Sequence, residues 1–456
     1  MENETMRPEF FNPLRPRHLN RRRFLEATAA GVLSAGIPAS STTSAHSPVA
    51  AEKTTVHQLG RAKHCIFLWL GGGACQIDTF DPKRLGDPKQ GAKQPGSHYP
   101  AIDTAIPGVQ VCEHLPGLAQ RLDRGSIIRS LNHDVIDEHA AATNRMHVGR
   151  PPTGTTVYPS IGSVVAQQLG ADGEGVPSYV VMGYPSATRG PGFLGSQFGY
   201  IYLTDTESGP AGLQRPVDVS AARMQRRNEL LQRQISRIQQ REGKDSSLSQ
   251  YGKTSQQAMR LAGPDFMPVF DLKSEDARLR ENYGDEFGQR CLLARRLVQS
   301  GVRFVEVSFN LNFINGTGWD THNEGQENQH ILIQQLDQAV STLVDDLERV
   351  GHLDDTLVVI ATEFGRPPEF DGGGGRGHQS RAFSTVLLGG GLKSGQVIGT
   401  TDELGRKVID RPVSVPDFHA TIYASLGINP SHELYDGDRP VPLTDQGIPV
   451  RELFEG

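Results

Sequence analysis

The chain has 456 residues and a formal net charge of −6, with acidic and basic residues interspersed along it. This charge pattern excludes a typical nucleic-acid-binding protein, and the length allows one large α/β domain or two smaller ones. The 51 glycines and 29 prolines indicate many loops, as in enzymes whose sites lie on the connections between elements.

Residues 1–51 have the parts of an export signal. Arg21 and Arg22 stand in the run Asn-Arg-Arg-Arg-Phe-Leu-Glu at 20–26, and a weakly apolar stretch and a small-residue tail follow. Adjacent arginines followed by X-Phe-Leu are typical of the twin-arginine pathway. The apolar stretch is shorter than the roughly 20 residues that a spanning helix needs. The sequence therefore predicts recognition by the twin-arginine machinery, a periplasmic or extracellular location and no stable membrane span.

After a linker at 52–62, buried strands and amphipathic helices alternate along 63–456. The first strand is the continuous apolar run 64–70, which glycines end. Further short apolar runs lie at 126–128, 178–182, 302–309, 356–361 and 383–388. Helical patterns lie at 115–122, 161–169, 287–299, 331–350 and 415–426. This alternation predicts an α/β fold with a doubly wound, mostly parallel central sheet and helices on both faces.

One segment departs from this alternation. Residues 217–243 form a highly polar helical pattern rich in Arg and Gln, and the residues after it are low in apolar content. We therefore expect a helical insertion at about 205–280. It is either a solvated excursion from the sheet or a lid that gates the substrate.

The four cysteines are Cys65, Cys75, Cys112 and Cys291, and none forms a CxxC pair. Their spacing disfavours a thiolate zinc site or a redox dithiol. An oxidising compartment would allow a disulfide between Cys65 and Cys112 or between Cys75 and Cys112. Four buried thiols are the alternative.

Carboxylates and histidines follow several of the predicted strands. Asp78 comes after the first strand, and later strands are followed by Asp320-Thr321-His322 and by Glu363, with His378 after a run of glycines. In open α/β sheets the ligand site lies beyond the carboxyl ends of the strands. A set of Asp, Glu and His side chains at that edge suits a metal-dependent hydrolase. We expect one or two divalent ions there, of zinc, calcium, magnesium or manganese.

A further candidate region runs from Arg129 and Ser130 into a predicted helix at 137–148. His139, Thr143 and His147 share one face of this helix at i, i+4 spacing. The spacing suits a metal site, and it suits an ordinary polar stripe equally well.

Several of these motifs resemble the alkaline phosphatase and sulfatase superfamily, and most of all an exported, sulfatase-like family of unknown function (domain of unknown function 1501). The resemblance covers roughly residues 60–450. The motifs that carry it are Gly72-Gly73 through Asp78-Thr79-Phe80-Asp81-Pro82, Leu292–Val298 leading into Gly301–Val305, Gly318-Trp319-Asp320-Thr321-His322, Thr362-Glu363-Phe364-Gly365-Arg366 and Asp417–Ile422.

The resemblance implies that Asp78, Asp320, His322, Glu363 and His378 bind the metal. Phe364 stands where the superfamily usually has a ligating histidine. The position of the usual nucleophile, eleven residues before Arg150, holds His139. Ser130 and Thr143 are the nearest hydroxyls. Metal-activated water is the alternative nucleophile.

The leading hypothesis is a metal-dependent hydrolase of sulfate or phosphate esters outside the cytoplasm, acting on a small anionic ester or on a sulfated or phosphorylated glycan. His139 would bind metal, transfer protons or act as nucleophile. Arg129, Arg366 or Arg376 would pair with the anionic group. The alternatives are a non-catalytic envelope protein that keeps the fold with a structural metal, and a mutase or phosphonate-cleaving relative.

Overall fold

A computed structural model describes residues 60–454 except 211–212, 214–217, 243–251, 253–260, 262–265, 310–311, 314–315 and 324. The predicted signal with Arg21 and Arg22 and the predicted boundary at residue 51 lie outside the described residues. In the described part, no helix combines the length and apolar character that a membrane span requires.

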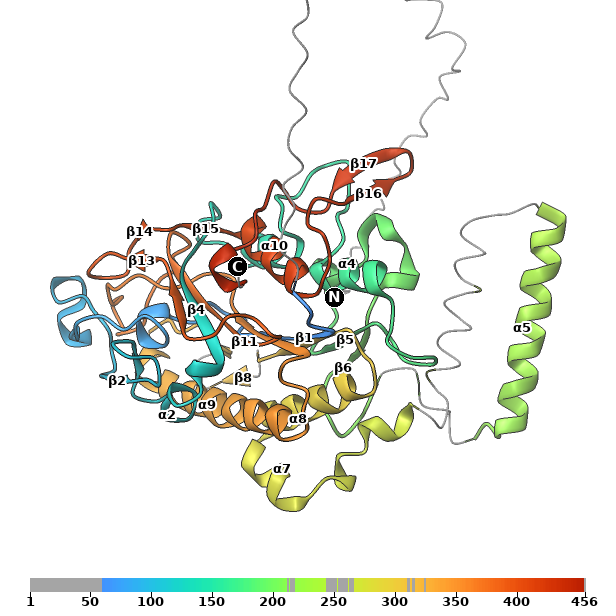
Figure 1. The fold of residues 1–456 in the computed structure, drawn as a ribbon, viewed down its shortest axis with the longest axis horizontal. Helices are drawn as coiled ribbons and strands as arrows, with labels where there is room; N and C mark the ends of the chain where they lie inside the picture. Colours follow the sequence, from blue (N-terminus) through green and yellow to red (C-terminus); the bar gives the residue numbers. More distant parts are fainter. Residues whose placement is uncertain are drawn as a thin grey trace, which may run out of the picture. The chain divides into compact units, whose positions relative to one another are not determined.

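A mixed, mostly parallel sheet forms the centre of the fold (Figure 1). Its order is β12–β4–β11–β10–β1–β7–β5–β6, and β15 pairs with β4. Only β11 runs antiparallel to its neighbours. The strands are β1 (His64–Trp69), β4 (Gly125–Asn132), β5 (Tyr179–Met182), β6 (Ile201–Leu203), β7 (Phe304–Ser308), β10 (Thr356–Ala361), β11 (Phe383–Gly389), β12 (Gln396–Ile398) and β15 (Val413–Ser414).

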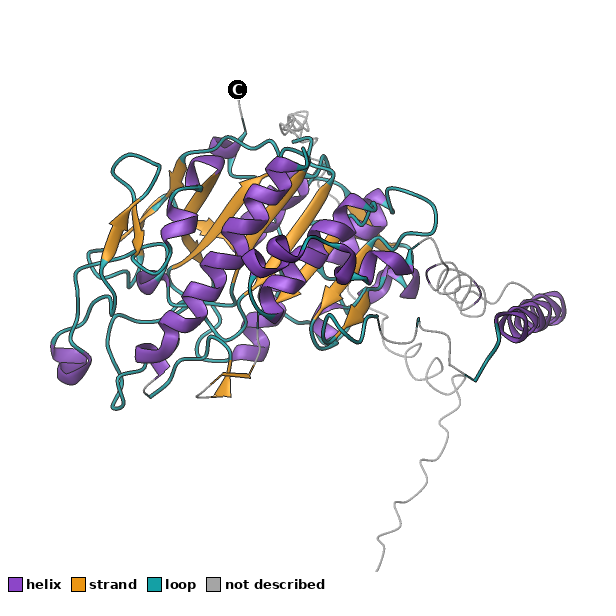
Figure 2. Cartoon of the chain, turned by 90° about the horizontal axis from the view of Figure 1, so that it is seen from below, coloured by secondary structure: helices purple, strands orange, loops and turns teal. Residues whose placement is uncertain are grey.

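Helices cover both faces of this sheet, as predicted (Figure 2). The helices are α2 (Pro116–Ala119), α3 (His139–Val148), α4 (Ile161–Leu169), α5 (Ala221–Glu242), α7 (Ala277–Tyr283), α8 (Glu286–Gln299), α9 (Gly325–Arg349) and α10 (Val415–Ser425). Small two-stranded sheets flank the centre: β2 (Ala101–Asp103) with β3 (Gln110–Cys112), β8 (Asn312–Phe313) with β9 (Gly316–Thr317), β13 (Thr400–Thr401) with β14 (Val408–Asp410), and β16 (Glu433–Asp436) with β17 (Arg439–Pro442).

The fully buried strand β1 explains why its sequence is a continuous apolar run. Ile66 and Leu68 pack into the core that α8 and α9 cover, whereas Phe67 packs into the core beneath α4 and α10. Successive side chains of a strand point to opposite faces, so both faces of β1 need apolar residues. The same physics accounts for the runs at β5, β7 and β10, all of which are fully buried.

The structure corrects the start of one predicted helix. Helix α3 begins at His139 and not at Asp137, because Asp137 has a positive φ of 54° and Glu138 is the N-cap. The Glu138 carboxylate accepts hydrogen bonds from the backbone N–H groups of Ala140 and Ala141. This arrangement leaves the Asp137 side chain outside the helix and free to turn towards other partners.

Helix α5 confirms the polar helix that the sequence predicts inside the insertion. The boundaries of the insertion, at about 205 and 280, stay a prediction.

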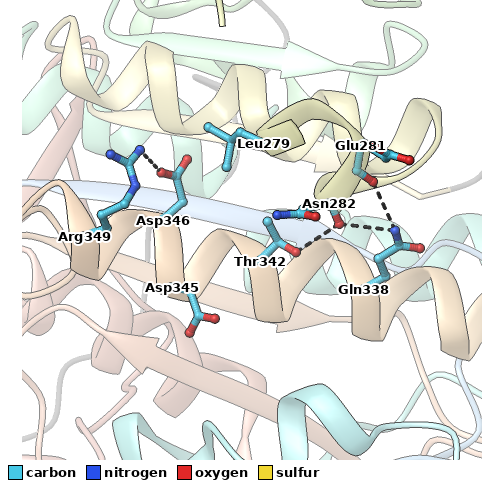
Figure 3. A pocket seen from close by; sticks show the side chains of 8 residues that line it. All are labelled: Leu279, Glu281, Asn282, Gln338, Thr342, Asp345, Asp346 and Arg349. Atoms are coloured by element: carbon cyan, nitrogen blue, oxygen red, sulfur yellow. Dashed lines mark hydrogen bonds and ion pairs between the residues drawn. The ribbon is translucent and has the colours of Figure 1, made fainter. Parts of the chain in front are cut away.

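A groove of about 580 Å³ lies between α7 and α9 (Figure 3). Asp346 in its wall pairs with Arg349, and Thr342 and Gln338 donate hydrogen bonds to the Asn282 carbonyl. No residue that lines this groove belongs to the site predicted from the sequence.

A buried network of charged side chains is centred on Glu306 of β7. Glu306 is completely buried and pairs with Arg189 and with His147 of α3, and the Tyr179 hydroxyl donates to it. Burial opposes its ionisation, yet its neighbours Arg189 and His147 lower the pKa of Glu306 to about 2. The network therefore joins α3 to the sheet through an ionised carboxylate.

We expect Glu306→Gln to destabilise the protein by about 3–5 kcal/mol, because it leaves Arg189 unpaired in the interior. A depressed carboxyl pKa stabilises the fold above the unfolded-state pKa of about 4.3, and that stabilisation is lost as the pH falls towards 2. Urea unfolding should therefore show that the wild type loses more stability than the variant between pH 5 and 2. Parallel pH profiles for the two proteins would contradict this assignment.

All four cysteines are free and buried, so the disulfide that the sequence allowed is absent and the alternative of four buried thiols is confirmed. Burial raises the pKa of the Cys112 thiol to about 12, and it raises the pKa values of the other three thiols further. A buried thiol of raised pKa forms little thiolate and is unreactive.

We expect the folded protein to show no thiol that reacts with Ellman's reagent, and denaturation without reductant to release all four. Colorimetric titration before and after guanidinium addition measures this. Two thiols in the denatured protein would instead indicate a disulfide.

Candidate metal centre

The topology brings five loops to one edge of the sheet. Strands β1, β7, β10 and β4 run in the same direction, so the segments that follow them leave from the same edge. Strand β11 runs the other way, so the loop that precedes it returns to this edge. The five loops are 71–73, 133–138, 318–323, 362–366 and 371–382.

Three histidines surround Asp320 at this edge. His139 Nε2 and His378 Nε2 are 3.1 Å apart, and His378 Nε2 lies 3.2 Å from Asp320 Oδ1. His322 Nε2 lies 3.1 Å from both of those His378 and Asp320 atoms. Ligand atoms of His139, Asp320 and His378 all lie within 4.8 Å of one another. Tetrahedral ligands at about 2.0–2.1 Å from zinc are about 3.3 Å apart, so these distances match a metal centre.

Two carboxylates stand behind the histidines. His139 Nδ1 lies 2.8 Å from Glu363 Oε1, and His378 Nδ1 lies 2.6 Å from Asp137 Oδ1. An ionised carboxylate only accepts, so each Nδ1 donates its proton outward, and each Nε2 faces Asp320. A cation at the two Nε2 atoms, either a proton or a metal ion, would offset the repulsion between nitrogens that lie 3.1 Å apart beside Asp320. A carboxylate behind a metal-binding imidazole is a common feature of zinc proteins.

These contacts change the role predicted for Glu363. It orients His139 from behind, where its Oε1 also accepts a hydrogen bond of 2.8 Å from the Gly72 N–H. Gly72 has a φ of 120°, and a Cβ atom there would overlap the backbone nitrogen of Asp320. The glycine turn after β1 is therefore needed for close packing against the 318–323 loop.

The carboxylates around the cluster favour positive charge at its centre. Hydrogen bonds to Asp320 and then to Glu363 raise the pKa of His139 to about 9. Burial opposes ionisation of Asp320, but hydrogen bonds from His139, His378 and Arg366 hold its pKa well below the usual range. Both shifts show that these side chains attract a cation.

Arg366 holds the loops of the site together. Its guanidinium is completely buried and donates 2.6 Å to Asp320 Oδ1. It also donates to backbone carbonyl groups in three loops. These carbonyl groups belong to Gly72, Gly73, Trp319, Arg376 and Gly377. Arg366 is therefore a positioning residue, and its N–H groups are directed at protein atoms.

Asp78 and Arg376 form a second buried pair that the structure does not place among the ligands. Asp78 is fully buried, and its carboxylate accepts from the Arg376 guanidinium, the Gln326 amide and the His98 N–H. Arg376 also donates to the carbonyls of Pro367, Pro368 and Gly96. This pair anchors the loop that carries His378.

The remaining predicted residues have other partners. Arg129 donates to the carbonyls of Phe80 and Gln110, and its guanidinium lies 3.4 Å from Asp81. The Ser130 hydroxyl donates to the Arg411 carbonyl. Among the described residues no hydrogen bond joins Thr143 to the metal cluster, and its carbonyl accepts from His147. The structure therefore brings His139, Asp320, His322, Glu363 and His378 together, and it leaves Asp78, Ser130, Thr143, Arg129 and Arg376 outside the ligand group.

Sequence reasoning missed the role of Asp137. Its spacing from His139 is i, i+2, like that of Asp320 and His322, and this repeated Asp-X-His pattern was the available signal. It also missed the packing role of Phe364, whose ring centroid lies 4.6 Å from that of His378 and 4.9 Å from that of His139. Phe364 thus packs against two imidazoles of the cluster.

We expect Glu363→Gln to weaken zinc binding about 10–100-fold, because the amide cannot hold the His139 imidazole as a carboxylate does. Competition with a chromogenic chelator measures the affinity, and circular dichroism checks the fold. Glu369→Gln is the matched control, since Glu369 pairs with Arg406 at the surface. Equal zinc affinity in the two variants would refute the role of Glu363.

A family model matches this chain, and several solved structures are weakly similar to it. No curated protein matches the sequence. Among solved structures, the sulfatase PsFucS1 from Pseudoalteromonas sp. is similar at 12% identity and a TM-score of 0.37, over 81% of this chain and 69% of that one. The lipoteichoic acid synthase LtaP from Listeria monocytogenes is similar at 10% identity and a TM-score of 0.40, over 86% and 77%. The phosphonate monoester hydrolase SpPMH from Silicibacter pomeroyi is similar at 10% identity and a TM-score of 0.34, over 74% of this chain and 71% of that one. A family model matches residues 62–454, and the chain therefore belongs to the family described as "Protein of unknown function (DUF1501)".

Proposed function

We propose that the protein is a metal-dependent hydrolase of sulfate or phosphate esters that acts outside the cytoplasm. The observation that supports this most directly is the convergence of His139, His378 and Asp320, with a carboxylate behind each of the two imidazoles. Mixed nitrogen and oxygen ligands of this kind suit zinc. Export through the twin-arginine pathway is part of the proposal and rests on the sequence of residues 1–51.

The chain's own residues divide the work as follows. His139, Asp320 and His378 hold one divalent ion, which when bound polarises the ester and lowers the pKa of water enough to supply hydroxide near neutral pH. His322 is the most exposed of the three histidines, with 41% of its side chain accessible, and it borders the ligand group. We assign proton transfer to His322 in place of the metal-binding role that the resemblance implies, with Asp371 Oδ2 3.7 Å from its Nδ1.

Water is the proposed nucleophile because the candidate hydroxyls have other roles. Ser130 donates to a backbone carbonyl, and Thr143 makes no hydrogen bond to the cluster in the described part of the chain. The Nδ1 atom of His139 faces Glu363, and its Nε2 atom would hold the ion, so neither nitrogen would be available for attack on the ester. A covalent step would therefore require one of these side chains to leave its present partner.

Two substitutions separate metal binding from catalysis. We expect Asp320→Ala to lose the bound metal, as measured by elemental analysis of the purified protein. We expect His322→Gln to keep the metal and to lose about 10²–10⁴-fold in kcat against a chromogenic ester. Asp320→Ala with unchanged metal content would refute the ligand assignment.

The same assays test the competing function. Wild-type protein that binds metal stoichiometrically and turns over no sulfate ester, phosphate monoester or phosphodiester would be a non-catalytic envelope protein with a structural metal. Product analysis on any substrate that is consumed distinguishes hydrolysis from a mutase reaction or phosphonate cleavage.

A further inference from the structure

The three arginines predicted to bind an anionic substrate all have internal partners. Arg366 and Arg376 are completely buried, and their donors point to carbonyl groups and to Asp320 or Asp78. Arg129 faces two carbonyl groups and Asp81. All three nitrogens of Arg366 and of Arg376 already donate to protein atoms, so these two guanidinium groups cannot also form the bidentate hydrogen bonds by which arginine holds a tetrahedral oxyanion.

Carboxylates outnumber cationic side chains around the cluster. Asp320, Glu363 and Asp137 all lie within hydrogen-bonding distance of a cluster histidine, and Asp371 lies 3.7 Å from His322. Against these four carboxylates, Arg366 is the one Arg or Lys side chain that forms an ion pair with the cluster in the described part of the chain. One divalent ion would not neutralise the set.

From this charge balance we infer that the site prefers an ester that carries a single negative charge over an ester that carries two. The preferred class is a sulfate monoester or a phosphodiester, and the disfavoured class is a dianionic phosphate monoester. The inference rests on the proposed hydrolase and narrows its substrate class. The physical reason is Coulombic, since a second charge on the substrate meets four carboxylates around the cluster, and in the described residues Arg366 is the one guanidinium that pairs with them.

A set of esters with one leaving group tests the inference by turnover. We expect the zinc-loaded protein to hydrolyse 4-nitrophenyl sulfate or methyl 4-nitrophenyl phosphate, both monoanions, more efficiently than 4-nitrophenyl phosphate. At a pH where 4-nitrophenyl phosphate is dianionic, the kcat/KM for one of the monoanions should be at least about tenfold higher. Which of the two monoanions is preferred identifies the acid. A higher value for the phosphate monoester would overturn the inference.

A binding measurement gives a readout that does not depend on turnover. Methanesulfonate and fully ionised methylphosphonate have nearly the same shape and differ by one charge. Calorimetric titration of the zinc-loaded protein should show tighter binding of methanesulfonate, by about tenfold or more. Equal binding, or tighter binding of methylphosphonate, would overturn the inference.

An added positive charge should shift the preference. Ile136 is 77% exposed and directly precedes Asp137, whose carboxylate contacts His378. We expect Ile136→Lys to raise the ratio of methylphosphonate to methanesulfonate binding about threefold or more at an ionic strength below about 0.1 M, where the Debye length exceeds about 10 Å. Ile136→Met is the matched neutral control and should leave the ratio unchanged. An unchanged ratio in the lysine variant would count against charge as the selecting property.

The two possible failures are distinct. If metal binds and none of the three esters is hydrolysed, the proposed hydrolase fails. If hydrolysis occurs and the dianionic ester is preferred, the hydrolase stands and the selection by charge fails.

Discussion

The interaction on which the site depends is the buried guanidinium of Arg366. It donates to the Asp320 carboxylate and to carbonyls of the loops at 71–73, 318–323 and 371–382. A buried charge is costly unless its hydrogen bonds are made, so the guanidinium is compatible only with a conformation in which all these loops are in place. The five-donor geometry of arginine allows one side chain to fix several chain segments at once. The cluster therefore owes its geometry to a residue whose donors all point to protein atoms.

The other buried charges follow the same principle. The Asp78–Arg376 pair anchors the loop that carries His378, and Glu306 ties α3, which carries His139, to the sheet. Both histidines are then oriented by a carboxylate behind the imidazole. Fixed rings whose Nε2 atoms converge lose little freedom when an ion binds, which is what a tight metal centre requires. Rigidity in the surroundings thus supports a centre whose histidines remain partly open to solvent.

Much of the fold follows from local patterns. The apolar runs predicted the strands β1, β5, β7, β10 and β11, because strands buried on both faces need no polar side. The helical periodicity predicted α4, α8, α9 and α10 for a similar reason. The start of α3 was misplaced, because Asp137 has a positive φ that ends the helical conformation, and its side chain contacts His378, a residue far away in sequence.

By itself the sequence determined the α/β class, the edge of the sheet at which chemistry-bearing residues collect, and the set of residue types found there. Local spacing places Asp320, His322 and His378 after strands, and that suffices to predict a metal centre. Only the tertiary structure decided which polar side chains face the centre and which serve one another. Glu363 binds His139, Asp78 binds Arg376, and Arg366 binds backbone carbonyls, because each is paired across a long sequence separation. Such pairings depend on where buried groups find partners, a property of packing that no local pattern encodes.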